Sequence, residues 1–188
     1  MTTLEELRES QTKAITEMLL HAHSKHVAGL EAMILRYQRD LLDTVEASRH
    51  AITTAADNHV TLAVVLNNVI HDFDMLARHY VPKACDFGFA RALTDLQSRG
   101  WLRHIHGTPH ADDALSAPVL MQNIRYLHDS LLPAMHKAIF DSASPDAKLT
   151  AMKARIGSYA HWLWRSSEQA YITTLRDFAN RVKVSKKV

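Results

Sequence analysis

The residues best suited to bind a partner lie close to the end of the chain, between residues 152 and 183. On a helix at roughly 100° per residue, four cations and one indole of this segment share an arc of roughly 80°. They are Arg155, Trp162, Arg165, Arg176 and Lys183, and the amides of Gln169 and Asn180 lie in the same arc. Cations beside an aromatic ring can contact phosphates and stack on a base. This face therefore predicts an anionic partner such as nucleic acid.

Two other interpretations fit the same face. The mixture of cations with an indole also suits an anionic membrane surface. Alternatively, the face is simply solvated, and the aliphatic stems of its arginines cover Trp162. Charge patterns specify partners only loosely, so all three interpretations stay open at this point.

The charge is unevenly divided along the chain, although the net charge is only +2. Residues 1–147 hold 13 Lys and Arg against 18 Asp and Glu, whereas residues 148–188 hold 9 against 2. A basic end on an acidic body predicts an anionic partner or the docking of one half against the other. In a homo-oligomer, the basic end of one copy would meet the acidic body of the next. We therefore expect a protein partner or a homo-oligomer, with nucleic acid as the anionic alternative.

Thirteen histidines in 188 residues suggest a test for metal-site spacing. His104, His106 and His110 form the clearest group. An HxH pair on an extended segment points both imidazoles to one side, and His110 could fold back as a third ligand. A complete site also needs ligands from elsewhere in the fold, and the sequence singles out none. These histidines are weak candidate ligands, and no metal or other cofactor is assigned.

A second set of weak candidates lies in the first half of the chain. His50 precedes the doublet His71-Asp72 by 21 residues. This order is similar to that in the HD-type metal-dependent phosphohydrolases, where a His on one helix and a His-Asp doublet on a later one bind a metal that activates water. A further Asp completes such a site, and Asp129 is available for it. The resemblance implies an HD-like phosphohydrolase as the enzymatic alternative.

Helical periodicity determines how these residues are positioned. The first 81 residues contain no proline and one glycine, and the apolar series Leu62, Leu66, Val69, Phe73, Leu76, Tyr80 steps by three and four. We predict an all-α fold, a bundle of about five to seven helices. Its long amino-terminal hairpin would occupy residues 1–82, with a break between Ser48 and Asn58 where polar side chains can cap a new helix.

The remaining helices are delimited by proline, glycine and capping residues. Pro82 is expected to end the hairpin, and residues 83–117 to hold a short helix that ends at Gly100, followed by a loop. Residues 118–182 should form two further helices, the first kinked at Pro133 and the second starting at Ser144-Pro145-Asp146. A basic tail, residues 183–188, completes a single all-helical domain.

Long helices with short connections offer extended surfaces but few places for a catalytic pocket. We therefore expect a non-enzymatic interaction or regulatory protein, a subunit of a larger assembly, and we assign no catalytic residue. The longest apolar run, residues 62–66, is too short to span a bilayer, and the first residues do not resemble a secretory signal. The single cysteine, Cys85, cannot form an internal disulfide. These features predict a cytoplasmic protein without a transmembrane segment.

Overall fold

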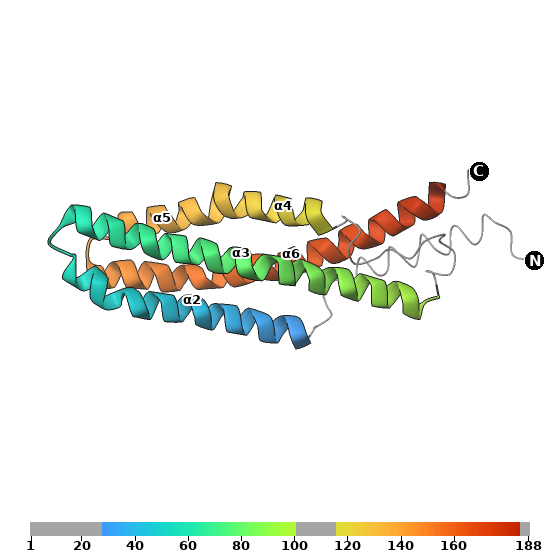
Figure 1. Cartoon of the computed structure of the whole chain (residues 1–188), viewed down its shortest axis with the longest axis horizontal. Coiled ribbons are helices and arrows are strands. Elements are labelled where there is room, and N and C mark those ends of the chain that lie inside the picture. The colour runs from blue at the N-terminus through green and yellow to red at the C-terminus, as the bar shows by residue number, and fades with distance from the viewer. Residues whose placement is uncertain (1–27, 101–115, 185–188) are drawn as a thin grey trace, which may run out of the picture.

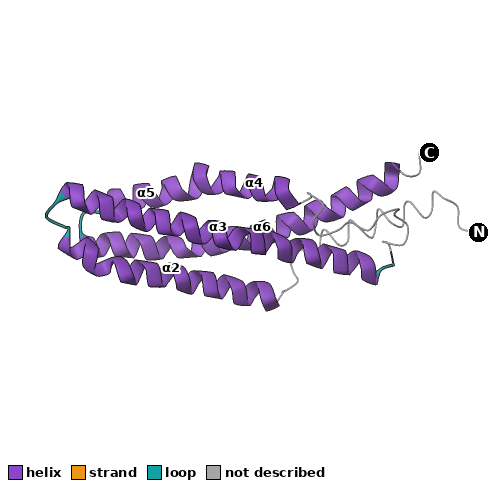
Figure 2. Cartoon of the chain, in the orientation of Figure 1, coloured by secondary structure: helices purple, strands orange, loops and turns teal. Residues whose placement is uncertain are grey.

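The structure is a computed structural model, and it describes residues 28–100 and 116–184. Its elements are α2 (Ala28–Thr54), α3 (His59–Ser98), α4 (Ser116–Tyr126), the π-helical turn η2 (Leu127–Leu131), α5 (Leu132–Phe140) and α6 (Pro145–Val184). All of them are helical, and these two ranges contain no strand (Figure 2). The predicted all-α class is therefore confirmed.

The described helices form a four-membered bundle, because α4, η2 and α5 follow one another as a single interrupted rod (Figure 1). Consecutive members run in opposite directions. Helices α3 and α6 contact each other along the centre, α2 packs against both, and the α4–η2–α5 rod packs against both as well. The described part thus has fewer helices than the five to seven expected from the sequence. The first apolar stripe, residues 4–22, lies outside the described residues.

The break predicted between α2 and α3 is confirmed. Helix α2 ends at Thr54, and Asn58 caps the start of α3. The Asn58 side-chain oxygen accepts hydrogen bonds from the backbone N–H groups of Val60 and Thr61, at 3.1 and 3.0 Å. A short polar side chain at this position satisfies donors that would otherwise lack a partner in the first helical turn.

The expectation that Pro82 ends its helix is wrong. Helix α3 continues through Pro82 to Ser98, so the predicted boundary at residues 82–83 and the separate short helix do not exist. Proline removes one backbone hydrogen bond from a helix interior. Twelve residues of α3 are buried, on both sides of the proline, and this packing offsets that loss. Gly100, at φ +70°, follows the end of α3 as predicted.

The predicted start of α6 is confirmed, and the helix that was expected to kink at Pro133 has a local irregularity there. Just before Pro133 lies the π-helical turn η2, in which the Leu132 N–H donates to the Leu127 carbonyl five residues earlier. Such a π-helical turn accommodates a neighbouring proline, which has no N–H to donate. At the start of α6, the Ser144 hydroxyl oxygen accepts a hydrogen bond from the Ala147 N–H at 3.2 Å.

Helices α3 and α6 approach each other closely at Gly88. A Cβ atom added to Gly88 would lie 2.0 Å from the Ser167 carbonyl oxygen, so only glycine permits this approach. Nearby, the buried thiol of Cys85 points to the Ser166 carbonyl oxygen, and burial raises the pKa of this thiol to about 12. A thiol in this environment stays protonated and unreactive at neutral pH.

Helix α3 is long and apolar enough to cross a membrane when judged by length and composition alone. No other helix in the two described ranges meets that test. In the bundle, α3 contacts α2, α6 and the α4–η2–α5 rod, and 22% of its most apolar 18-residue window is buried. The expected cytoplasmic location and the absence of a transmembrane segment stay predictions.

Candidate functional site

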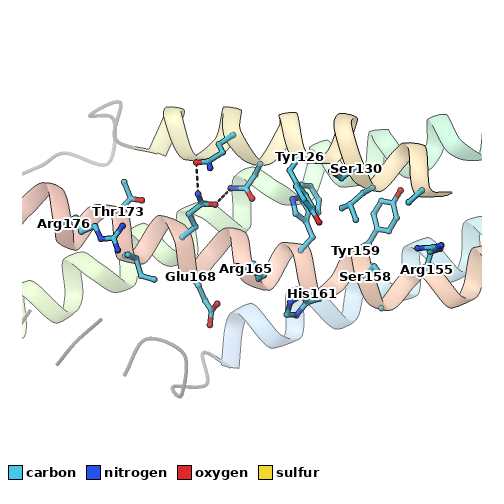
Figure 3. A pocket seen from close by; sticks show the side chains of 18 residues that line it. Tyr126, Ser130, Arg155, Ser158, Tyr159, His161, Arg165, Glu168, Thr173 and Arg176 are labelled. Atoms are coloured by element: carbon cyan, nitrogen blue, oxygen red, sulfur yellow. Dashed lines mark hydrogen bonds between the residues drawn. The ribbon is translucent and has the colours of Figure 1, made fainter. Parts of the chain in front are cut away.

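A groove of about 1130 Å³ lies between α6 and the α4–η2–α5 rod, and we call it the α6 groove (Figure 3). The α6 wall includes a series that steps by three and four: Arg155, Ser158, Trp162, Arg165, Gln169, Ile172 and Arg176. The opposite wall consists of Gln122, Asn123, Tyr126, Ser130, Leu131 and Ala134. Steps of three and four place residues on one face of a helix, so each wall is a single helical face.

Four of the five predicted binding residues line this groove. They are Arg155, Trp162, Arg165 and Arg176. The side chain of Lys183 lies outside the described residues. Gln169, predicted to share their arc, also lines the groove. The sequence therefore identified five of the seven residues of the α6 series, and the sequence prediction named no residue of the opposite wall.

The groove carries an excess of positive charge. Arg165 and Arg176 are exposed and Arg155 is half-buried. None of the three guanidinium groups forms an ion pair with a carboxylate in the described parts of the chain. Glu168 is the only acid among the lining residues, and its carboxylate accepts a hydrogen bond from the Trp164 indole N–H at 3.0 Å. With His161 neutral, three arginines and one glutamate leave a formal charge of two positive units.

The expectation of an exposed indole among the arginines is wrong. Trp162 is only 4% exposed, and its buried indole nitrogen has no hydrogen-bond partner among the residues that the structure describes. The cause is the α4–η2–α5 rod, which packs along this side of α6 and makes Trp162 part of the groove floor. A helical projection shows which residues share a face, but it does not show which neighbouring helix covers that face.

The accessible aromatic side chain of the groove is Tyr126, which the sequence analysis missed. Tyr126 is 52% exposed and lines the wall opposite the arginines. A sequence signal for it exists in the predicted helix 118–140. Every fourth position of one of its faces is held in turn by Gln122, Tyr126, Ser130 and Ala134. That repeat marks a polar face with one aromatic ring, next to the apolar face that forms the core.

A chain of hydrogen bonds fixes the two walls relative to each other. The buried Asn123 amide donates to the Gln169 side-chain oxygen at 3.1 Å and accepts from the Ser166 hydroxyl at 2.8 Å. Gln169 in turn donates to the Gln122 side-chain oxygen at 2.8 Å, at the surface (Figure 3). This network joins α4 to α6 through polar atoms, and the buried Asn123 amide finds its hydrogen-bond partners within the bundle.

Cations near the start of α6 are paired. Glu46 on α2 accepts hydrogen bonds from Lys153 and Arg49, and these bonds lower the pKa of its carboxyl group to about 2. Lys148 is buried and donates to the carbonyl oxygens of Ile139 and Ser142 at the end of α5. These cations join helices together, which distinguishes them from the three arginines of the α6 groove.

The weak metal candidates that the structure describes are not assembled into a site. His50 lies on α2, the doublet His71-Asp72 lies on α3, and all three side chains are exposed. Over the described ranges, no group of three His, Cys, Asp or Glu side chains could hold a metal ion. His104, His106 and His110 lie outside the described residues. His128, next to Asp129, instead approaches Asp74, with 3.6 Å between the His128 Nε2 and the Asp74 carboxylate.

The site is thus a polar groove with three arginines, one accessible tyrosine and a rigid amide network. It can bind an anion by charge and by planar hydrogen bonding from guanidinium groups. Comparison of the chain with family models, curated proteins and solved structures gives no match. The function must therefore be inferred from the residues of the groove.

Proposed function

We propose that this protein is a non-enzymatic helical interaction protein, a subunit of a larger assembly that binds nucleic acid through the α6 groove. The observation that carries the proposal is the convergence of Arg155, Arg165 and Arg176 on one groove without carboxylate partners in the described residues. Each guanidinium group offers five N–H donors, which suit the oxygens of a phosphate.

The spacing of the arginines favours an extended anion over a small one. Arg155 and Arg176 are 21 residues apart on a continuous helix. That separation corresponds to about 32 Å at 1.5 Å per residue, with Arg165 near its middle. A single small anion would contact one of the three groups, whereas a phosphate backbone repeats its charge along its length and can contact all of them.

Electrostatics supports the same conclusion. Three guanidinium groups along one groove make its surface positive, and a positive surface attracts anions. Phosphate groups that bind there release their condensed counterions, a gain that depends steeply on salt. The acidic body of a second copy could bind the same surface, so a homo-oligomer is the main competing outcome of the tests.

The test is charge reversal within the groove. We expect the double variant Arg165→Glu, Arg176→Glu to lose most of the salt-dependent retention of DNA or RNA shown by the wild type at low ionic strength, measured by fluorescence anisotropy. The matched control is Arg36→Glu, Arg39→Glu, because both residues are exposed cations on α2, across the α3–α6 pair from the groove. This control changes the net charge equally and should retain most of the binding.

Two outcomes would contradict the proposal. One is a wild-type chain that shows no salt-dependent binding to DNA or RNA at low ionic strength. The other is an equal loss of binding in the groove variant and in the α2 control. Light scattering across the same salt series identifies a homo-oligomer, since contacts between a basic and an acidic surface loosen as screening rises.

A further inference from the structure

The α6 groove is recessed between two helices. Its floor consists of buried side chains, among them Asn123, Tyr159 and Trp162, which are 6%, 1% and 4% exposed. Its rim consists of exposed side chains, among them Tyr126 and Arg165. A ligand that contacts both the floor and the arginines must therefore lie along the groove, between α6 and the α4–η2–α5 rod.

This shape is poorly suited to a duplex. A helix that reads duplex DNA enters the major groove, which is about 12 Å wide and admits one helix of about 10–12 Å diameter. Between Arg155 and Arg165, α6 does not stand alone, because the rod packs beside it. Two helices packed about 8–10 Å apart present a width of about 20 Å. The pair therefore cannot enter the major groove, and its shared groove meets a duplex only at the outer edge of the backbone.

The wall opposite the arginines supplies what a single strand needs. Figure 3 shows Tyr126 reaching from α4 toward α6, and its ring is 52% exposed. Unpaired bases have free faces, and a base stacks on an aromatic side chain with little dependence on its identity. Arginines on one wall and a tyrosine on the other can thus contact the phosphates and a base of the same strand at once.

We propose that the α6 groove binds single-stranded nucleic acid in preference to duplex, with Tyr126 as a stacking platform and Arg155, Arg165 and Arg176 on the backbone. This inference rests on the proposed nucleic-acid function and adds that the bound nucleic acid is single-stranded. It assigns Tyr126 a direct contact with a base.

The experiment compares one labelled 20-nucleotide DNA of mixed sequence, single-stranded and annealed to its complement, by fluorescence anisotropy at low salt with the full chain. We expect the single strand to bind at least about 10-fold more tightly. Tyr126→Ala should weaken single-strand binding by about 5- to 150-fold, the range expected for the loss of one base stack. Tyr126→Phe should retain it, because the ring is kept. The matched control is Phe140→Ala, since Phe140 is a 36% exposed aromatic residue that does not line the groove.

The possible outcomes separate a failure of this inference from a failure of the proposed function. Duplex binding as tight as single-strand binding would overturn this inference and leave the proposed function intact. Undiminished binding by Tyr126→Ala, with its helical circular dichroism unchanged, would overturn the stacking role. Absence of binding to either form would overturn both proposals together.

Discussion

Two sides of the same helix, α6, are built in opposite ways. Toward α3, α6 approaches so closely that an added Cβ at Gly88 would lie 2.0 Å from the Ser167 carbonyl oxygen. Toward the α4–η2–α5 rod, α6 leaves a groove of about 1130 Å³ lined by polar and charged side chains. A small residue lets α3 and α6 approach closely, whereas the arginines on the groove side keep contact with water. The first side therefore stabilises the fold, and the second is available for binding.

Substitution of Gly88 tests the packed side and should have the largest effect. Gly88→Ala forces the α3 backbone away from Ser167, and we expect the free energy of unfolding to fall by about 3 kcal/mol. Urea denaturation measures this change. The matched control is Gly157→Ala on the groove side, where an added Cβ meets nothing within 4 Å. That substitution should raise stability by about 0.5–1 kcal/mol through helix propensity. If both substitutions changed the free energy of unfolding equally, α6 would not be more tightly packed toward α3 than toward the groove.

Substitution of Asn123 tests the polar network that joins the two walls. Asn123→Ala removes one of the two partners of Gln169 and one partner of the Ser166 hydroxyl. Because these groups are buried or half-buried, we expect a loss of about 1–3 kcal/mol in the free energy of unfolding. Gln122→Ala removes an exposed member of the same network, and its cost should stay below about 0.5 kcal/mol. A comparable loss of unfolding free energy in both variants would show that the buried amide stabilises the fold no more than the exposed one.

The pH dependence of stability tests the paired cations and should show the smallest effect. Lys153 and Arg49 lower the folded-state pKa of Glu46 to about 2, below the ordinary value of 4.5. A lowered pKa means that the contribution of this group is present above pH 4.5 and is lost as the pH falls toward 2. Glu46→Gln should therefore reduce the acid sensitivity of unfolding over that window. Unchanged acid unfolding of this variant would show that the ion pairs add nothing, as is common for exposed pairs.

The sequence predicted those features of the fold that depend on local chemistry. Asn58 and Ser144 cap helices because their side chains reach backbone donors within three residues. The apolar series of α3, including Leu66, Val69 and Phe73, is buried as its periodicity predicted. Pro82 was misjudged because the cost of a missing hydrogen bond is local, whereas the packing that offsets it comes from other helices.

The candidate site was only half predictable for the same reason. Arginines 155, 165 and 176 share a helical face by their spacing alone, and the structure places them on one groove. The burial of Trp162 and the exposure of Tyr126 depend on how α4 packs against α6, a contact between residues more than thirty positions apart. The repeat of Gln122, Tyr126 and Ser130 marks a polar face of the rod, but no local pattern shows which face of α6 the rod covers. The sequence therefore predicted the exposed ring on α6, where Trp162 is buried.

The salt dependence of binding measures how many phosphates the three groove arginines contact. The measurement is the slope of log K against log salt concentration for a single-stranded oligonucleotide, with the wild type and with Arg155→Ala, Arg165→Ala, Arg176→Ala combined. Each phosphate contact contributes about −0.7 to this slope, so the triple variant should lose about two units of slope. An identical slope for the two proteins would show that these arginines do not contact phosphates.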